Sequence, residues 1–197
     1  KKTVESIRQL GYTVDIYDLG GLEMGTLFDG KFSNVNGAKI PSKPKIIKQT
    51  LTKEIIRKDD YIVWVDADTI VWNNIDEIMM KYDVGVTVRK PKAVENDLPI
   101  NAGVVILRKT PKAQEFLDRW IALCDNSKSD QQELNKLCKV TTKDLNDVVD
   151  RDGVKIKVFP CDIYNNFYFK KPQNHAKIIH YKSKSRKYWP TRNLNKC

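Results

Sequence analysis

The sequence has no long apolar run, and this absence limits what the protein can be. A transmembrane helix needs roughly 20 consecutive apolar residues, and no segment of the 197 residues approaches that length. The chain opens with Lys1-Lys2 directly into a helix-like pattern, so we expect no signal peptide. These two absences predict a protein without a membrane span.

Cysteine is scarce and unpaired in the sequence. Cys124, Cys138, Cys161 and Cys197 form no Cys-x-x-Cys motif. A chain of this length can bury one sizeable core and does not depend on disulfides for its stability. We therefore expect free thiols in a reducing compartment, which favours a cytoplasmic protein.

Repeats, low-complexity segments and linkers are also absent. The hydrophobic content of 41% is typical of a soluble globular protein. We therefore expect a single domain over residues 1–197.

Acidic residues are missing from the C-terminal stretch, residues 170–197, which holds nine basic ones. The formal net charge is +10, so the rest of the chain is almost balanced. Basic residues with Tyr181, Tyr188 and Trp189 among them are one way to bind and stack nucleic acid. A nucleic-acid-binding module is therefore one alternative.

The most informative stretch runs from Tyr61 to Trp72. It begins with nearly unbroken apolar, β-prone sequence, which predicts a buried central strand, and this strand ends abruptly at Asp66-Ala67-Asp68. In a strand, residues two apart point the same way, so Asp66 and Asp68 can share one target, and Ala67 leaves the approach open. The carboxyl edge of an open α/β sheet is the usual place for a ligand.

Two carboxylates at the end of an apolar strand repel each other unless a cation neutralises them. A divalent metal ion is the simplest partner, because Mg²⁺ and similar ions take one or two carboxylates together with water and phosphate oxygens. The alternative interpretation is a solvated turn with two surface aspartates. A lone Asp-x-Asp does not decide between them.

The remaining periodicity alternates helices with strands. We expect helices over residues 1–10, 43–57, 75–80 and 111–124 and from 129 onward, and strands over 13–19, 83–88, 104–107, 154–159 and 176–180. This pattern predicts an α/β fold with a mixed, mainly parallel sheet flanked by helices. Because a helix leads into strand 13–19, we expect that the first strand of the fold precedes Lys1.

Polar residues border several of these elements. Asn101-Ala102-Gly103 introduces the apolar run to Leu107, and small residues there let the backbone come close to a ligand. Ser129 with Gln132 matches a capping box, so Asp130 has a purely structural interpretation in the first helical turn.

Two further features occur near the C-terminus. The last predicted strand ends in His180, as the earlier strand ends in aspartate, although a lone histidine in that place is more often structural. The pair Asn165-Asn166 and the aromatic run 167–169 belong either to the core or to the wall of an acceptor site.

Four short motifs together resemble the GT-A glycosyltransferases, which are metal-dependent enzymes that use sugar nucleotides. They are most similar to the retaining family-eight galactosyltransferases and their relatives, over about Lys43 to Trp189. Four motifs in the right order are much more specific than one. The motifs are Asp66-Ala67-Asp68, Asn101-Ala102-Gly103, Ser129-Asp130-Gln131 and His180-Tyr181.

The resemblance implies a role for each motif. Asp66-Ala67-Asp68 matches the Asp-x-Asp that binds the divalent ion and the ribose and diphosphate of the nucleotide, and His180 matches a further metal ligand. Asn101, with Ala102 and Gly103, matches an asparagine near the donor sugar. Asp130 and Gln131 match the acidic and amide pair on the reactive face of that sugar.

The resemblance also implies the ligands. Lys184 and Lys187 lie where the family has a phosphate-contacting lysine, although His-Tyr-Lys-Ser-Lys-Ser-Arg-Lys-Tyr-Trp departs from the usual His-x-Gly-x-x-Lys-Pro-Trp. The implied cofactor is Mn²⁺ or Mg²⁺, with Mn²⁺ favoured by the histidine. The implied donor is a nucleotide sugar, most simply UDP-linked, whose hexose is transferred with retention to a glycan or glycoprotein.

The compact, lysine-rich chain is also similar to glycosyltransferase domains of large algal viruses that decorate capsid glycans. That similarity implies one domain of a longer polypeptide, acting in the host cytoplasm beside other domains of the same chain.

Three other functions are alternatives, and one of them is a non-catalytic sugar-nucleotide-binding domain. A sugar-phosphate nucleotidyltransferase shares the sheet and uses metal, but no Gly-rich phosphate loop is present near the start. A nucleic-acid-binding module explains the basic stretch, but leaves Asp66, Asp68 and Asp130 unexplained, because anionic clusters repel phosphate without a metal. We therefore favour the transferase and expect no nucleic-acid partner.

Overall fold

The computed structural model describes residues 2–14, 43–91, 98–125, 127, 129–167 and 175–181. In chain order its elements are α1 (Lys2–Gln9), α2 (Lys43–Leu51), β1 (Tyr61–Val65), β2 (Thr69–Val71), the 3-10 helix η2 (Asp76–Ile78), β3 (Val84–Val88), β4 (Ile100–Arg108), α3 (Pro111–Cys124), α4 (Asp130–Cys138), the 3-10 helix η4 (Thr142–Asp144), β5 (Val148–Arg151), β6 (Val154–Pro160), α5 (Cys161–Tyr164) and β7 (Ile178–His180). Most of the strand expected over 13–19, the aromatic residues Tyr168 and Phe169, and Lys184 and Lys187 lie outside the described residues.

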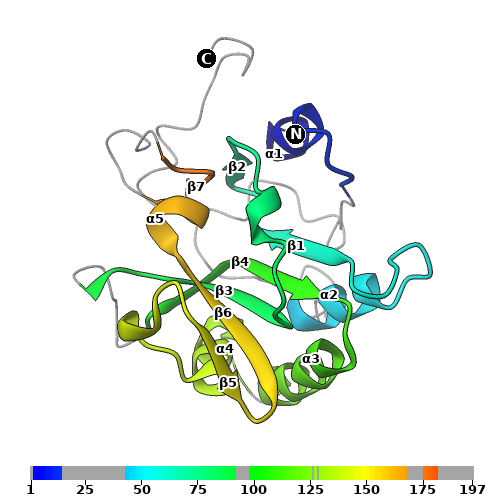
Figure 1. The fold of residues 1–197 in the computed structure, drawn as a ribbon, viewed down its shortest axis with the longest axis vertical. Coiled ribbons are helices and arrows are strands. Elements are labelled where there is room, and N and C mark those ends of the chain that lie inside the picture. Colours follow the sequence, from blue (N-terminus) through cyan, green and yellow to red (C-terminus); the bar gives the residue numbers. More distant parts are fainter. Residues whose placement is uncertain are drawn as a thin grey trace, which may run out of the picture.

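A five-stranded sheet in the order β1-β4-β3-β6-β5 forms the centre of the fold (Figure 1). The mixed α/β class is confirmed, but the expectation of a mainly parallel sheet is wrong for the described strands. Only β3 and β6 pair in parallel, and the other three pairings are antiparallel. Neighbouring antiparallel strands need only short connections, whereas a parallel pair needs a long crossover.

Two apolar cores cover the two faces of this sheet. On one face α2, α3 and α4 pack against it, with Trp120, Phe116 and Leu134 fully buried. On the other face lie α1, β2, β7 and α5, with Tyr82 and Phe159 at the centre of a cluster of edge-to-face rings. Figure 1 shows the same division, with the three helices below the sheet and the small β2-β7 sheet above it.

Strand β1 is not the buried central strand that its apolar sequence predicts. Among the described strands it lies at one edge of the sheet, and all five of its residues are only half buried. The centre belongs to β4 and β3, whose residues are buried almost throughout. Asn101-Ala102-Gly103 lies inside β4 and does not precede it, because Ile100 already pairs with Val88.

Two other boundaries differ from expectation. Helix α2 ends at Leu51 and not at Arg57, since the Thr52 hydroxyl bonds to the Lys48 carbonyl and Ile55, which continues the apolar period, is 78% exposed. Strand β5 was not predicted at all. It forms a hairpin with β6 through Asp152-Gly153, whose φ angles of 54° and 77° suit the tight turn that an Asp-Gly pair favours.

The helix expected over residues 75–80 is only the 3-10 helix η2 (Asp76–Ile78), and most of the remaining described elements confirm the periodicity. Helix α3 begins at Pro111, and Ser129 caps α4 by accepting a hydrogen bond from the Gln132 amide. Cys124 and Cys138 are buried free thiols, as expected. None of the described helices is long and apolar enough to cross a membrane.

Candidate metal and donor site

The two aspartates lie in a turn that directly follows β1. The Asp66 amide donates to the Gly103 carbonyl of β4 at 2.9 Å, so the C-terminal end of β1 lies beside the first half of β4. The Asp66 carbonyl then accepts bonds from the amide and hydroxyl of Thr69, at 3.1 and 2.7 Å. Asp66 and Asp68 therefore converge because the chain turns, and not because they alternate along a strand, as the sequence suggested.

Helix α1 supports this turn from behind. The Thr3 hydroxyl donates to the Ala67 and Thr69 carbonyls, both at 2.7 Å. The Ser6 hydroxyl accepts from the Val71 amide at 3.1 Å. These contacts involve backbone atoms, so Ala67 contributes its carbonyl to the scaffold while its small side chain leaves the site open.

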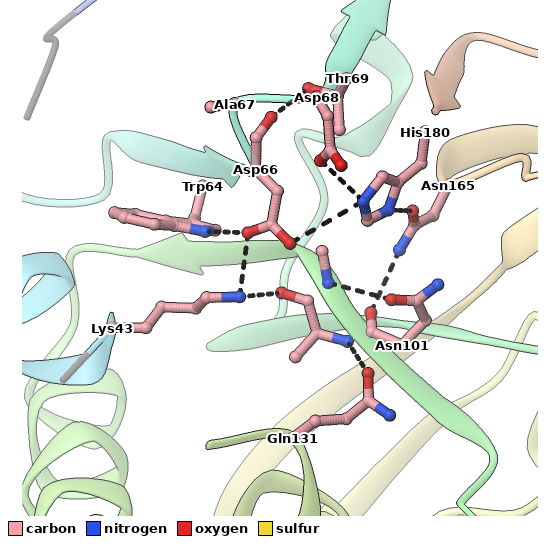
Figure 2. A network of polar contacts seen from close by, with 12 residues as sticks. Lys43, Trp64, Asp66, Ala67, Asp68, Thr69, Asn101, Gln131, Asn165 and His180 are labelled. Carbon is pink, nitrogen blue, oxygen red and sulfur yellow. Dashed lines mark hydrogen bonds and ion pairs between the residues drawn. The ribbon is translucent and has the colours of Figure 1, made fainter. Parts of the chain in front are cut away.

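Strand pairing delivers the third polar group. β2 and β7 are antiparallel with Thr69 opposite His180, and the Tyr181 amide donates to the Asp68 carbonyl at 2.8 Å. As a result His180 Nε2 lies 3.0 Å from Asp68 Oδ1 and 3.9 Å from Asp66 Oδ2 (Figure 2).

These side chains suit a divalent cation. One ligand atom from each of Asp66, Asp68 and His180 lies within 4.8 Å of the others. Two neighbouring ligands of an octahedral ion with bonds of about 2.1 Å stand about 3 Å apart, so small side-chain shifts would bring all three onto one ion. Two carboxylates and an imidazole are an ordinary set of ligands for a divalent metal ion.

The orientation of His180 is fixed by Asn165, which is completely buried. The Asn165 amide nitrogen donates to the Asn101 carbonyl at 3.1 Å and to the Thr87 hydroxyl at 2.8 Å. A carbonyl can only accept, so the nitrogen must face it, and the Asn165 oxygen must face His180 Nδ1 at 2.9 Å. His180 Nδ1 therefore carries the hydrogen.

It follows that the other ring nitrogen of a neutral His180 presents a lone pair to two carboxylates. Lone pairs that face each other at 3.0 Å repel unless a cation or a proton lies between them. A hydrogen-bond partner that fixes the tautomer in this way is typical of histidines that bind metal.

Gly103 makes room for the ring. A Cβ atom at this position would lie 2.4 Å from Cε1 and 2.5 Å from Nδ1 of His180, closer than real atoms approach. The same atom would lie 3.3 Å from Asp66 Oδ2. Glycine in β4 is therefore required by the close approach of His180.

Lys43, at the start of α2, was not predicted as a site residue. Its ammonium lies 3.0 Å from Asp66 Oδ1 and 3.3 Å from Asp130 Oδ2, and donates to the Ala102 carbonyl at 2.8 Å. Burial by itself lowers the pKa of Lys43, but Asp66 and Asp130 outweigh burial and raise it above its ordinary value. Lys43 therefore stays charged and links the two carboxylates.

Asp66 thus has two differently engaged oxygens. Oδ1 accepts from the Trp64 indole at 3.0 Å and pairs with Lys43, while Oδ2 faces His180 (Figure 2). Trp64 was also missed, because its sequence context reads simply as apolar strand. For Lys43 and Trp64 we find no sequence signal that separates them from ordinary residues of a helix start and a strand.

Helix α4 brings Asp130 and Gln131 to the same edge. Asn135 bonds to both backbone groups of Ile100, and Gln131 Oε1 accepts from the Ala102 amide at 3.3 Å. The capping position of Ser129 and the pairing of Asp130 with Lys43 are compatible, so the structural and functional interpretations of Asp130 do not exclude each other. Asn101 accepts from the Gly103 amide at 3.2 Å, and its side-chain nitrogen is buried without a partner among the described residues.

Comparison with known proteins agrees with this geometry. A family model described as nucleotide-diphospho-sugar transferase matches residues 43–187. The chain belongs to this family. It is a glycosyltransferase with a GT-A-like fold. Membership of this family favours the transferase function over the nucleotidyltransferase and nucleic-acid-binding alternatives.

Two solved structures are similar to this transferase. A glycosyltransferase involved in the glycosylation of the major capsid of PBCV-1 is 17% identical with a TM-score of 0.57, covering 94% of this chain and 90% of that one. The glycosyltransferase GlyE of Streptococcus pneumoniae TIGR4 is 18% identical with a TM-score of 0.42, covering 66% of this chain and 35% of that one. No curated protein matches the sequence.

The role of Asn165 in fixing the His180 tautomer can be tested by mutation. Replacing Asn165 by leucine removes the acceptor at His180 Nδ1, so we expect Mn²⁺ affinity to fall by about 10- to 100-fold, the usual effect of losing such a partner. Electron paramagnetic resonance of free Mn²⁺ measures the affinity, and ¹⁵N NMR of the metal-free protein reports the tautomer.

Asn73→Leu is the matched control, since Asn73 bonds to the Ala176 carbonyl beside the same strand without contacting His180. The account of His180 is wrong if Asn165→Leu keeps both the hydrogen on Nδ1 and the wild-type Mn²⁺ affinity.

Proposed function

We propose that this glycosyltransferase is metal-dependent and transfers a hexose from a UDP-sugar to a hydroxyl of a glycan or glycoprotein. The observation that carries the proposal is the convergence of Asp66, Asp68 and His180 within 4.8 Å, beside Asp130 and Gln131. The family transfers sugars from nucleotide-diphospho-sugars, which are anionic. A site with two carboxylates repels such a donor unless a cation is present.

In this proposal Asp66, Asp68 and His180 hold the divalent ion. The bound ion supplies positive charge at the leaving diphosphate. We favour Mn²⁺ over Mg²⁺, because Mg²⁺ prefers oxygen ligands and this site includes an imidazole. The proposed phosphate contacts of Lys184 and Lys187 lie outside the described residues and stay predictions.

We propose that Asp130 and Gln131 face the reactive side of the donor sugar, with Asn101, Ala102 and Gly103 forming the wall beside it. Positive charge develops on the sugar ring as the diphosphate leaves, and carboxylate and amide oxygens nearby stabilise it. Lys43 holds Asp130 at 3.3 Å and Asp66 at 3.0 Å, so one ammonium fixes the distance between the proposed metal ligand and the proposed sugar-facing group.

Three broader predictions stay open to test. The sequence pattern and the resemblance described above support all three. They are a single domain over residues 1–197, its place within a longer polypeptide, and a cytoplasmic or viral setting.

Metal dependence is tested by calorimetric titration of UDP in Mn²⁺ and in EDTA. We expect tight binding only with Mn²⁺, because the diphosphate otherwise meets two carboxylates at short range. Asp68→Asn keeps the shape but removes one charge, and should weaken the Mn²⁺-dependent affinity at least about tenfold. Asp125→Asn is the control, since Asp125 pairs only with Lys45 at the surface among the contacts described. Equal UDP affinity in EDTA and Mn²⁺ would reject the metal assignment.

Retention is tested on the product. Because Asp130 and Gln131 are proposed to line the donor face, we expect the first-formed glycosidic linkage to keep the anomeric configuration of the donor. Proton NMR of that linkage decides the question, and an inverted product would reject the roles of Asp130 and Gln131 while leaving the metal site intact.

A further inference from the structure

Four buried side-chain atoms of the described residues lack a hydrogen-bond partner, and three of them belong to one edge of the sheet. These three are Arg89 Nε, Asn101 Nδ2 and Asp162 Oδ1, while the fourth, Arg119 Nε, belongs to α3. A buried polar atom without a partner costs about 1 to 3 kcal/mol, so a cluster of them is a sign of a missing ligand.

Strand pairing places the three residues together. Val88, the last residue of β3, pairs with Ile100 of β4 on one side and with Pro160 of β6 on the other. Arg89 directly follows Val88, Asn101 follows Ile100, and Asp162 lies two residues beyond Pro160. Arg89 and Asp162 therefore follow the parallel strands β3 and β6 at the same edge, and Asn101 lies one position inside β4 beside that edge.

Arg89 is held rigidly although its Nε is unpaired. The residue is 1% exposed, and its Nη1 donates to the Leu98 and Ile100 carbonyls at 2.5 and 3.2 Å. Its guanidinium lies 5.9 Å from the centre of the Phe167 ring. An arginine this well fixed presents its Nε–H in one direction only.

Asp162 supplies the opposite kind of group. Its Oδ2 pairs with Lys90 Nζ at 2.7 Å and faces His175 Nε2 at 3.7 Å. Its Oδ1 is the buried atom without a partner. The Lys90 contact shows that the chain just beyond β3 meets the start of α5.

This place adjoins the candidate metal site. Asn165, which follows Asp162 in the same short segment, donates to the Asn101 carbonyl and holds His180. In Figure 2, Asn101, Asn165 and His180 lie on one side of Asp66, and Lys43 and Trp64 lie on the other. Asn101, the residue of the three that Figure 2 labels, therefore lies on the His180 side of the site.

We propose that Arg89 and Asp162, with Asn101 at the boundary, form the subsite for the sugar that accepts the transferred hexose. This inference rests on the proposed function. Two N–H donors and one carboxylate oxygen match neighbouring hydroxyls of a neutral sugar, since each hydroxyl both accepts and donates. The carboxylate disfavours a phosphate, and the buried polar atoms disfavour an apolar group.

The subsite is tested by NMR with methyl glycosides of galactose, glucose, mannose and xylose as probes, on the full chain with UDP and diamagnetic Mg²⁺. We expect at least one glycoside to shift the Arg89 Nε–H resonance, which is assigned by its absence from Arg89→Lys. Asp162→Asn turns the unpaired acceptor into an amide, and should weaken the affinity for that glycoside by about tenfold or more.

A control variant and a measurement of UDP affinity complete the test. Lys90→Gln removes the ion pair at Asp162 Oδ2 but leaves Oδ1 in place, so glycoside affinity should change less than threefold. Measuring UDP affinity in the same samples separates the two proposals. If the wild-type protein does not bind UDP, the proposed function is rejected. Intact UDP binding without any glycoside shift, or with equal glycoside affinity in Asp162→Asn and wild type, overturns the acceptor subsite alone.

Discussion

The Asp66 carboxylate is the group on which the candidate site depends, because its two oxygens serve two different partners. Lys43 and Trp64 satisfy Oδ1 from the side of α2 and β1, and Oδ2 faces His180 from β7. A carboxylate with one oxygen held by a buried ammonium still offers its other oxygen to a cation. Lys43 therefore neutralises charge at Asp66 Oδ1, while the negative charge at Oδ2 stays available for a cation.

The fold places these partners by strand register. The Asp66 amide bonds to Gly103 across β1 and β4, and β2 pairs with β7 so that Thr69 stands opposite His180. Shifting either pairing by one residue would turn the functional side chain to the opposite face. The two apolar cores on either side of the sheet hold both registers, so the geometry of the site is a consequence of packing far from it.

The sequence reveals the parts of the site that are local and hides those that arise from packing between distant segments. Asp66 and Asp68 are visible because an apolar strand ends at them, and Asp130 because a helix begins there. His180 needed the resemblance, since a strand-end histidine alone is ambiguous. Lys43 and Asn165 gain their roles only when α2 and α5 meet the β1 and β7 edges, which no periodicity encodes.

The errors in the predicted fold have both local and non-local causes. The helical period of residues 43–57 continues past Leu51, but Ile55 faces solvent and the Thr52 hydroxyl bonds back to the helix carbonyls. The strand directions depend on which strands become neighbours, and sequence patterns of burial do not contain that information. Asp152-Gly153 was the available signal for the β5-β6 hairpin.

Pulsed electron paramagnetic resonance of the Mn²⁺-loaded protein, labelled with ¹⁵N-histidine and mixed with UDP, tests the central claim most directly. The account predicts ¹⁵N hyperfine coupling from directly bound His180, which disappears in His180→Gln, together with ³¹P coupling from the diphosphate on the same ion. Bound Mn²⁺ that shows ³¹P coupling but no ¹⁵N coupling, or ¹⁵N coupling that survives in His180→Gln, would contradict it.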